Sequence, residues 1–342
     1  MKKCKVLLVA NNYDQTYDGI GAFATAVSKK FSNQIVLRVY SSNCSENESV
    51  FQRITTMGMT KAINRASTEL GEKDAVLLDY PFVEWNPCII FSYLHLVRMC
   101  RSHHGKLFLS LHEYSRVNTL RKAVIRVFAR TADCVFVSNE TLAQEIRPFA
   151  KNIRYRNIPT NIFGHTETGS HDEHTFVYFG LVNRTKAFDE MLAGWDIFNA
   201  TGEYTLNVLT GSRLSGLEKH KNVNYLFHLQ DAEILKTMCN AAYCIIPVRP
   251  EIDMKNGTFK TGALAGCVCI GKFNEEYRHL PFVMEMNDYD PADFAEAFQN
   301  VSALDLDKIK EMGRSAAAFG KKYTPKAVAE VVEKEILAFM EG

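Results

Sequence analysis

The sequence predicts an α/β protein of two doubly wound domains, each with a parallel sheet that helices cover on both faces. Its 342 residues, 46% of them hydrophobic, are enough to bury two cores. The strand-like runs are apolar along their whole length, as in strands whose two faces are both covered. Helical stretches separate these runs, and the same alternation starts again after a polar stretch at residues 159–174.

The first half of the chain accounts for the first predicted domain. We expect its strands at residues 5–10, 34–40, 75–79, 106–111, 134–137 and 153–158. The polar stretch that follows is rich in Thr, Asn, Gly and Ser, and we expect it to be the linker. We therefore assign residues 1–165 to an N-terminal domain.

The second half predicts a similar domain at residues 166–322. Its strands are expected at residues 175–179, 204–209, 223–227, 243–247 and 267–270, with helices near 186–199, 231–240 and 257–266. The chain becomes helical after Pro291, and the last helix, at residues 325–340, has a broad apolar stripe. We expect the C-terminal segment, residues 323–342, to pack back onto the first domain.

The charge of the chain is divided between its halves. Residues 1–165 carry 22 Lys and Arg against 13 Asp and Glu, a net of +9, whereas residues 166–342 carry 18 against 26, a net of −8. A basic half suits a phosphate-rich partner such as anionic lipid headgroups or a lipid diphosphate. Opposite charges also suit two domains that face each other, and the two explanations are compatible.

No secretory leader or membrane span is predicted. The longest early apolar run, residues 6–10, is too short for either, so we expect a cytoplasmic protein, with the inner face of the cell membrane as an optional location. The nine scattered cysteines are expected to be reduced core thiols. Histidines 165, 171 and 174 lie in the predicted linker without fixed geometry, so no metal is expected.

A basic amphipathic helix is predicted at residues 120–130. Its outward arginines suit anionic lipid headgroups, or they form an ordinary solvated face. Nucleic acid is not expected as a partner, because no platform of aromatic residues accompanies the charge. The side chains expected to face the core are Leu120, Val124, Val127 and Phe128.

The loop after the first strand contains a glycine pattern. Gly19, Gly21 and Ala24 match G-x-G-x-x-A, but Gly19 lies too far beyond the strand for the tight turn of a dinucleotide site. The second strand is also not followed by the acidic residue that would bind a ribose hydroxyl. The loop is therefore interpreted as a helix entry suited to an anion or a sugar.

The segment at residues 243–271 has the layout of a phosphate-binding site. An apolar strand is followed by a polar loop, a helix start at Asn256-Gly257-Thr258, and a second apolar strand. The unpaired N–H groups and the positive dipole of a helix start favour an anion, and glycine lets it approach the backbone. Lys255 and Lys260 flank this turn.

Several of these segments resemble the GT-B glycosyltransferases. The likeness covers nearly the whole chain and implies two Rossmann-like domains that face a cleft, with a nucleotide-sugar bound by the C-terminal one. A UDP- or GDP-sugar is then a substrate, and no cofactor is expected. The segments that carry the likeness in the first half are Asp18-Gly19-Ile20-Gly21, Leu111-His112-Glu113, residues 133–139 and Ile158-Pro159-Thr160-Asn161.

The second half contains a closer match. Residues 179–186 resemble the family's Gly-Arg-x(4)-Lys loop, whose cations bind the donor diphosphate; Lys186 occupies the lysine position and Arg184 replaces the arginine. The family's pair of glutamates is absent, because Asp253 and Thr261 stand at those positions. The sugar contact then falls to Glu251 or Asp253, and the ribose contact is left unassigned.

The resemblance also implies roles for individual residues. Asp18, His112 and Glu113 are the catalytic candidates: an inverting enzyme would use one as a base, whereas in a retaining enzyme His112 would position a sugar. His228 and Leu229 lie where the family binds the nucleobase. The full set of expected substrate contacts is Gly19, Gly21, Gly180, Arg184, Lys186, Gly211, His228, Leu229, Glu251, Asp253, Asn256, Gly257, Thr258 and Lys260.

The resemblance implies a glycosyltransferase that moves one sugar to a glycan or a lipid-linked acceptor. Bacterial capsule, O-antigen or lipopolysaccharide synthesis is the expected setting. Two alternatives remain open. One is a non-catalytic nucleotide-sugar-binding scaffold, favoured by the missing glutamates, and the other is a sugar-nucleotide epimerase, disfavoured by the few carboxylates in the predicted loops.

Overall fold

The computed structural model describes residues 3–14, 19–42, 58–82, 88–115, 117–160, 162, 164, 171–183, 185–212, 220–253 and 255–341. Backbone contacts divide the chain into two compact units. Unit 1 consists of residues 1–158 and 325–342, and unit 2 consists of residues 159–324. The domain limits expected from the sequence, at residues 165 and 322, stay a prediction.

Unit 1 is built on a six-stranded sheet in which every neighbouring pair is parallel. The strand order is β2-β1-β3-β4-β5-β6, so the winding direction reverses between β1 and β3. In open sheets of this kind, ligands bind beyond the carboxyl ends of the strands at such a reversal. The strands are β1 (Cys4–Ala10), β2 (Ile35–Ser41), β3 (Ala75–Tyr80), β4 (Lys106–Leu111), β5 (Cys134–Val137) and β6 (Ile153–Tyr155).

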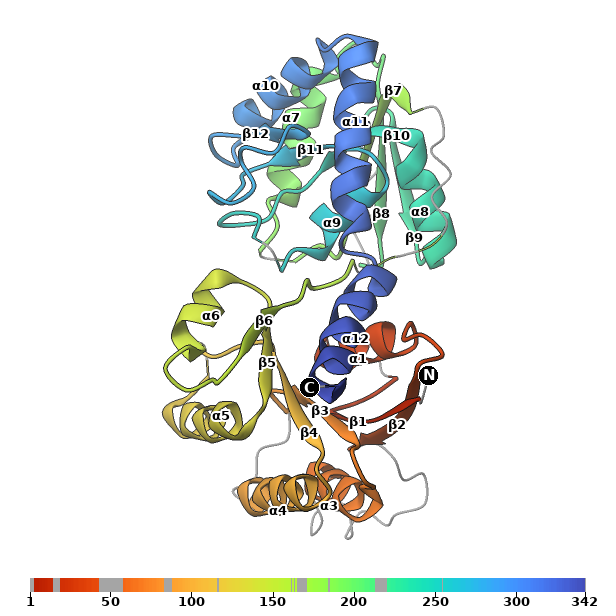
Figure 1. Cartoon of the computed structure of the whole chain (residues 1–342). Coiled ribbons are helices and arrows are strands. Elements are labelled where there is room, and N and C mark those ends of the chain that lie inside the picture. Colours follow the sequence, from red (N-terminus) through yellow and green to blue (C-terminus); the bar gives the residue numbers. More distant parts are fainter. Residues whose placement is uncertain are drawn as a thin grey trace. The chain divides into compact units, whose positions relative to one another are not determined.

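Helices cover both faces of this sheet (Figure 1). On one face, Val6 and Leu8 of β1 share a core with Val332 and Ile336 of the C-terminal helix, which lies beside α1. On the other face, the alternate side chains of β1 pack with α3, α4, α5 and α6. The helices of unit 1 are α1 (Gly19–Ser28), α3 (Gly58–Glu69), α4 (Cys88–Ser102), α5 (Thr119–Thr131), α6 (Glu140–Ile146) and α12 (Pro325–Glu341).

Unit 2 also has a six-stranded parallel sheet, with the order β12-β11-β10-β7-β8-β9. This is the order of a dinucleotide-type Rossmann fold, and its winding reverses between β7 and β10. The strands are β7 (Asp172–Phe179), β8 (Thr205–Thr210), β9 (Val223–Phe227), β10 (Ala241–Ile245), β11 (Val268–Gly271) and β12 (Val283–Glu285).

Several limits in unit 2 differ from the sequence-based expectations; β10, for example, was expected at residues 243–247. Residues 172–174, expected in the linker, form the start of β7, because Asp172 pairs with Ala241 of β10 in the sheet. The short edge strand β12 was missed because its three residues are half-buried or exposed and lack a run of buried apolar side chains.

One large core, which includes the fully buried Trp195, joins the helices of unit 2 to its sheet. Helix α7 packs against α10, and α9 packs against α11. The helix α9 is buried along its whole length, so its position relative to the strands is fixed by packing. The helices are α7 (Phe188–Phe198), α8 (Asp231–Asn240), α9 (Gly257–Leu264), α10 (Pro291–Ser302) and α11 (Leu306–Lys321).

Candidate functional site

A cavity of about 490 Å³ lies at the carboxyl ends of β7, β8 and β9 in unit 2. These strand ends adjoin the point where the winding of the sheet reverses, the place where Rossmann-like sheets bind ligands. The cavity is lined by Phe179, Gly180, Leu181, Asn183, Lys186, Leu209, Thr210, Gly211, Leu226, His228, Leu229, Ile234 and Thr258.

The backbone turns sharply at two strand ends of this cavity. Gly180 directly follows β7 and has a φ of 144°, a backbone conformation that residues other than glycine rarely adopt. His228 directly follows β9 with a φ of 53°. At Gly211, after β8, an added Cβ would meet no atom closer than 3.5 Å, so the missing side chain leaves open space in the cavity.

Lys186 contributes a positive charge to the lining of the cavity. Its backbone N–H donates to Asn183 O over 2.9 Å, and the residue forms a bridge with Val248 that holds it beside β10. Burial lowers the pKa of its ammonium group, and within the described part of the chain no carboxylate pairs with it. A half-buried cation without a counter-charge is stabilised by an anionic ligand.

The start of α9 forms another wall. The Asn256 side chain caps the helix by accepting from the N–H of Phe259 over 2.8 Å. The first N–H groups of a helix have no partner within it, and those of Gly257 and Thr258 belong to this set. Thr258 also lines the cavity. Its Oγ1 lies close to Gly180, because a Cβ added at Gly180 would be 3.6 Å from it. The arrangement suits an anion near Lys186.

The structure brings together six of the substrate contacts expected from the sequence: Gly180, Lys186, Gly211, His228, Leu229 and Thr258. Five others do not line this cavity. Glu251 is exposed, Asp253 accepts from the N–H of Lys255, and Asn256, Gly257 and Lys260 belong to or cap α9. Arg184 lies outside the described residues.

Sequence reasoning missed several lining residues, among them Asn183, Thr210, Leu226 and Ile234. Thr210 and Leu226 sit at or beside strand ends, and an inspection of every strand end would have found these two. Thr261, which stands at a glutamate position of the resembled family, is fully buried and donates its hydroxyl to Gly257 O over 2.8 Å. It is therefore turned into the helix rather than toward the cavity.

In unit 1, His112 and Glu113 follow β4 and are both half-buried. The His112 ring lies edge-on to Phe23 of α1, with 4.7 Å between ring centroids, and its Nε2 lies 2.8 Å from Asp79 Oδ1. Asp79 is near the end of β3, so the carboxyl ends of neighbouring strands meet here. Asp18, the third catalytic candidate, lies outside the described residues.

Gly19 is the first residue of α1, and Gly21 lies in its first turn. An added Cβ at Gly21 would lie 2.4 Å from Asn12 O and 2.7 Å from Asn11 O. Glycine at this position therefore lets α1 approach the loop that follows β1. This close packing gives Gly21 a structural role, whether or not a ligand also contacts it.

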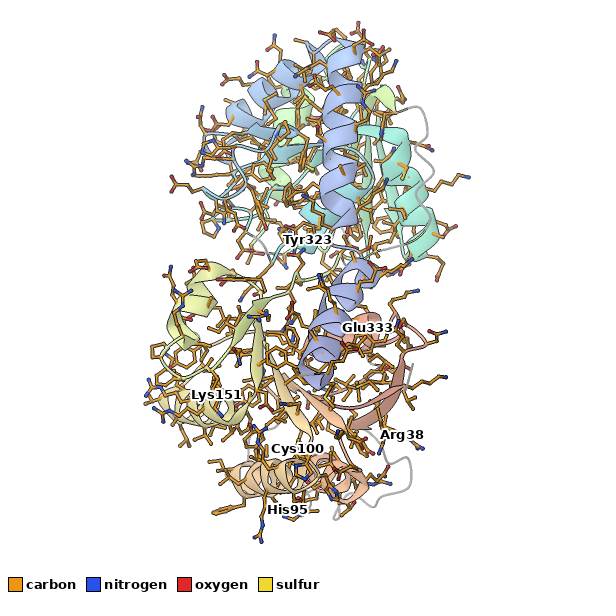
Figure 2. All side chains as sticks on the ribbon, in the orientation of Figure 1. Arg38, His95, Cys100, Lys151, Tyr323 and Glu333 are labelled. Carbon is orange, nitrogen blue, oxygen red and sulfur yellow. The ribbon has the colours of Figure 1, made fainter. Side chains whose placement is uncertain are left out.

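Lys260 of α9 is fully buried, and its Nζ lies 5.0 Å from the centre of the Tyr323 ring (Figure 2 labels Tyr323). Burial lowers the pKa of its ammonium group to about 7, against the opposing effect of the Asp253 and Glu276 carboxylates. Lys260 is thus held in the interior of unit 2, away from the cavity lining.

We expect Lys260 to make stability depend on pH. In the unfolded chain a lysine keeps its proton up to about pH 10.4, so between pH 7 and that value the unfolded state binds more protons and the unfolding free energy rises with pH. Lys260→Met should abolish this contribution. The difference in unfolding free energy between the two proteins, from urea titrations at pH 7, 8 and 9, should change by up to about 1.4 kcal/mol per pH unit. A constant difference would contradict the assignment.

Within the described residues, no group of three His, Cys, Asp or Glu side chains is placed to hold a metal ion. A search of the helices in the same part of the chain finds none that is both long enough and apolar enough to cross a membrane.

Comparison with solved structures identifies proteins of the same architecture. An α,α-trehalose 6-phosphate synthase from Burkholderia multivorans has a TM-score of 0.61 and 10% identity, covering 100% of this chain and 98% of that chain. An α-glucosyltransferase in complex with UDP has a TM-score of 0.60 and 12% identity over 100% of both chains. The chain has the GT-B fold.

The fold predicted from the sequence is therefore confirmed. A second α-glucosyltransferase structure, in complex with UDP-glucose and DNA containing an abasic site, matches with a TM-score of 0.61 and 12% identity over 100% of both chains. No family model matches the sequence, and a comparison with curated proteins finds no match. At these identities the likeness establishes the fold alone.

Proposed function

We propose that the protein is a glycosyltransferase that takes a sugar from a UDP-sugar bound in the cavity of unit 2. One observation carries the proposal: six residues expected to contact a nucleotide-sugar line a single cavity at the carboxyl ends of a Rossmann-like sheet. Structures with the same fold have been solved with UDP and with UDP-glucose, which supports this choice of donor.

The cavity offers different groups to the two ends of a UDP-sugar. We place the diphosphate near Lys186, the backbone at Gly180 and the start of α9, where positive charge and N–H groups gather. The uridine then lies toward His228 and Leu229, which follow β9. During transfer, Lys186 would stabilise the negative charge that develops on the leaving diphosphate.

We propose that unit 1 binds the acceptor with the loops at the carboxyl ends of its strands, where His112 and Glu113 lie. A glycan or lipid-linked acceptor in bacterial capsule, O-antigen or lipopolysaccharide synthesis fits the net charge of +9 in residues 1–165. Among proteins of this fold, one structure has UDP-glucose and DNA bound, and others are named for trehalose 6-phosphate. Sugar phosphates and DNA should therefore be tested as acceptors along with glycans and lipid-linked glycans.

The test is the release of nucleoside diphosphate from a panel of UDP- and GDP-sugars, with and without each class of acceptor. The proposal predicts that at least one UDP-sugar is turned over and that an acceptor accelerates the reaction. Lys186→Ala, measured in parallel, should lose this activity because the diphosphate loses its cation. Binding of several donors without turnover across a broad acceptor panel would instead favour a nucleotide-sugar-binding scaffold.

We also propose that unit 1 contacts anionic lipid headgroups through α4. Phe91 and Leu94, one turn apart on this helix, are 73% and 43% exposed, and His95 and Arg98 are exposed beside them. The sequence of α4 has no acidic residue. Figure 2 shows His95 on the outer side of α4, with Cys100 on the side of the strands. Apolar and basic side chains together suit the surface of an anionic membrane.

We choose α4 for this role over the basic helix at residues 120–130, for which the sequence left a lipid contact and a solvated face open. Leu120 of α5, expected in the core, is 54% exposed, and Ile125 is buried in its place. Arg126 donates from Nε to Tyr114 Oη over 2.7 Å, and its guanidinium lies 5.0 Å from the centre of the Phe149 ring. Arg126 is exposed but is engaged with Tyr114 and Phe149. Among the described residues, α4 exposes two large apolar side chains, Phe91 and Leu94, and α5 exposes one, Leu120.

We expect Arg98→Glu and Phe91→Ser each to reduce binding to vesicles that contain phosphatidylglycerol. A basic residue near an anionic surface contributes about 1 kcal/mol, so charge reversal should lower the partition coefficient several-fold. Vesicle sedimentation at low and high salt measures the effect. Arg38→Glu, the same charge change on the exposed side of β2, is the matched control and should behave as the wild type. Equal recovery of Arg98→Glu and wild type would exclude α4 as the contact.

A further inference from the structure

Three positive charges follow one another along one side of α5. Lys122, Arg126 and Arg130 are four residues apart, so they lie on successive turns of the helix, about 6 Å apart along its axis. Arg126 and Arg130 are exposed, and Lys122 is half-buried. The sequence of α5 contains no Asp or Glu. We call these three side chains the cation row.

Two aromatic rings hold the cation row in place. Lys122 Nζ lies 5.6 Å from the centre of the Tyr114 ring, and Arg126 Nε donates to Tyr114 Oη over 2.7 Å. The guanidinium groups of Arg126 and Arg130 lie 5.0 and 5.1 Å from the centre of the Phe149 ring. Because each contact restricts a long side chain, less conformational entropy is lost when the row binds an anion.

The charges of the cation row are not neutralised within the described part of the chain, where no carboxylate forms an ion pair with them. Other arginines of unit 1 do have such partners: Arg101 pairs with Asp133, Arg147 with Glu140 and Arg154 with Glu335. Like charges on successive turns of a helix repel one another. A ligand with several negative charges relieves this repulsion.

The cation row starts beside the carboxyl end of β4. Tyr114, which contacts Lys122 and Arg126, is the third residue after this strand and directly follows Glu113. Strands β4 and β5 are parallel, so α5, which connects them, runs back from the carboxyl ends of the strands. A chain molecule that ends at these strand ends can therefore extend along the row.

We propose that the cation row binds an anionic glycan, a chain of sugars that carry carboxylate or phosphate groups, and that this glycan is the acceptor. Its role as acceptor rests on the proposed function, whereas its binding to α5 does not. Negative groups that recur along an extended chain match positive charges that recur along one helix. Arginine in particular forms two parallel hydrogen bonds with a carboxylate or a phosphate.

Two other polyanions fit this surface less well. Single-stranded nucleic acids stack their bases on exposed aromatic rings, but Tyr114 is only 7% exposed and two guanidinium groups lie over Phe149. A membrane surface calls for exposed apolar side chains beside the charges, and among the described residues of α5 only Leu120 is a large exposed one.

Isothermal titration calorimetry of the whole protein tests the binding, with oligogalacturonate and its uncharged methyl ester as probes. The acid should bind, with an affinity that falls as salt is added, and the ester should not. Arg126→Gln/Arg130→Gln should weaken binding of the acid at least tenfold. Arg38→Gln/Arg65→Gln, the same charge change at exposed positions of β2 and α3, is the matched control and should bind as the wild type does.

Kinetics test whether the bound glycan is the acceptor. With an anionic acceptor, Arg126→Gln/Arg130→Gln should raise the KM for the acceptor, while kcat and the KM for the UDP-sugar stay the same. An unchanged KM for the acceptor would refute this role. A wild type that binds oligogalacturonate through the cation row but transfers no sugar refutes the proposed function and leaves the binding site standing.

Three results would overturn the binding site itself. The first is equal affinity of the wild type for the acid and its ester, and the second is equal affinity of the wild type and Arg126→Gln/Arg130→Gln for the acid. The third is tighter binding of oligothymidylate or phosphatidylglycerol vesicles than of oligogalacturonate, lost in the same variant. If that variant does not fold, Lys122→Gln replaces it and should weaken binding of the acid several-fold.

Discussion

Replacing Lys186 with alanine is expected to weaken the binding of UDP tenfold or more. A charge-assisted hydrogen bond to phosphate contributes about 1.5 to 3 kcal/mol, and Lys186 is half-buried in the cavity without a carboxylate partner in the described residues. Isothermal titration calorimetry of the two proteins with UDP measures the change. The loss should be smaller for uridine, which has no phosphates.

The matched control is Lys236→Ala. Lys236 is exposed on α8, two residues from Ile234 of the cavity wall, but does not line the cavity itself. This variant should bind UDP as the wild type does, because a solvated charge outside the cavity contributes little. If Lys186→Ala and Lys236→Ala have equal affinities, the diphosphate does not bind at Lys186.

Gly21→Ala is expected to destabilise the protein by about 1 to 3 kcal/mol, the usual cost of adding a methyl group to a packed site. The new Cβ would lie 2.4 Å from Asn12 O, and both atoms belong to parts of unit 1 that cannot easily separate: α1 and the loop after β1. Urea denaturation followed by circular dichroism measures the loss.

Gly211→Ala is the comparison variant. The nearest atom to its added Cβ, Leu181 Cδ2, is 3.5 Å away, an ordinary contact, so stability should change by less than about 0.5 kcal/mol. Because the methyl group enters the cavity, UDP binding should weaken instead. Equal stability of Gly21→Ala and wild type would show that α1 moves away without cost and that Gly21 is not needed for packing.

Most of the sheet framework could be predicted from the sequence because its strands are apolar on both faces. The Val223–Phe227 strand and the Asp231–Asn240 helix have the predicted limits. The polar start of β7 and the three-residue β12 were missed, since each is stabilised by pairing with a neighbour rather than by an apolar run. Pairing between distant strands leaves no local pattern in the sequence.

The candidate site was predictable to the extent that it follows strand ends. Gly180, Gly211 and His228 each come directly after a strand, and the structure gathers them around one cavity. The burial of Lys260 could not be predicted, because it depends on packing between α9 and the distant Tyr323.

The cluster around His112 shows the same limit. Asp79, Ser110 and Arg156 are far apart in the sequence, and only the strand order β3-β4-β5-β6 brings them together. Arg156 has no local feature that marks it as buried. Its pairing with Ser110 becomes visible only when the order of the strands is known.

The most direct test of a nucleotide-sugar site in unit 2 is a crystal structure of the protein soaked with UDP. The account predicts electron density for UDP in the 490 Å³ cavity, with its phosphates within hydrogen-bond distance of Lys186 and near Gly180 and Thr258, and its uracil near His228 and Leu229. Density for UDP at another position, with this cavity empty at a saturating concentration of nucleotide, would contradict the central claim.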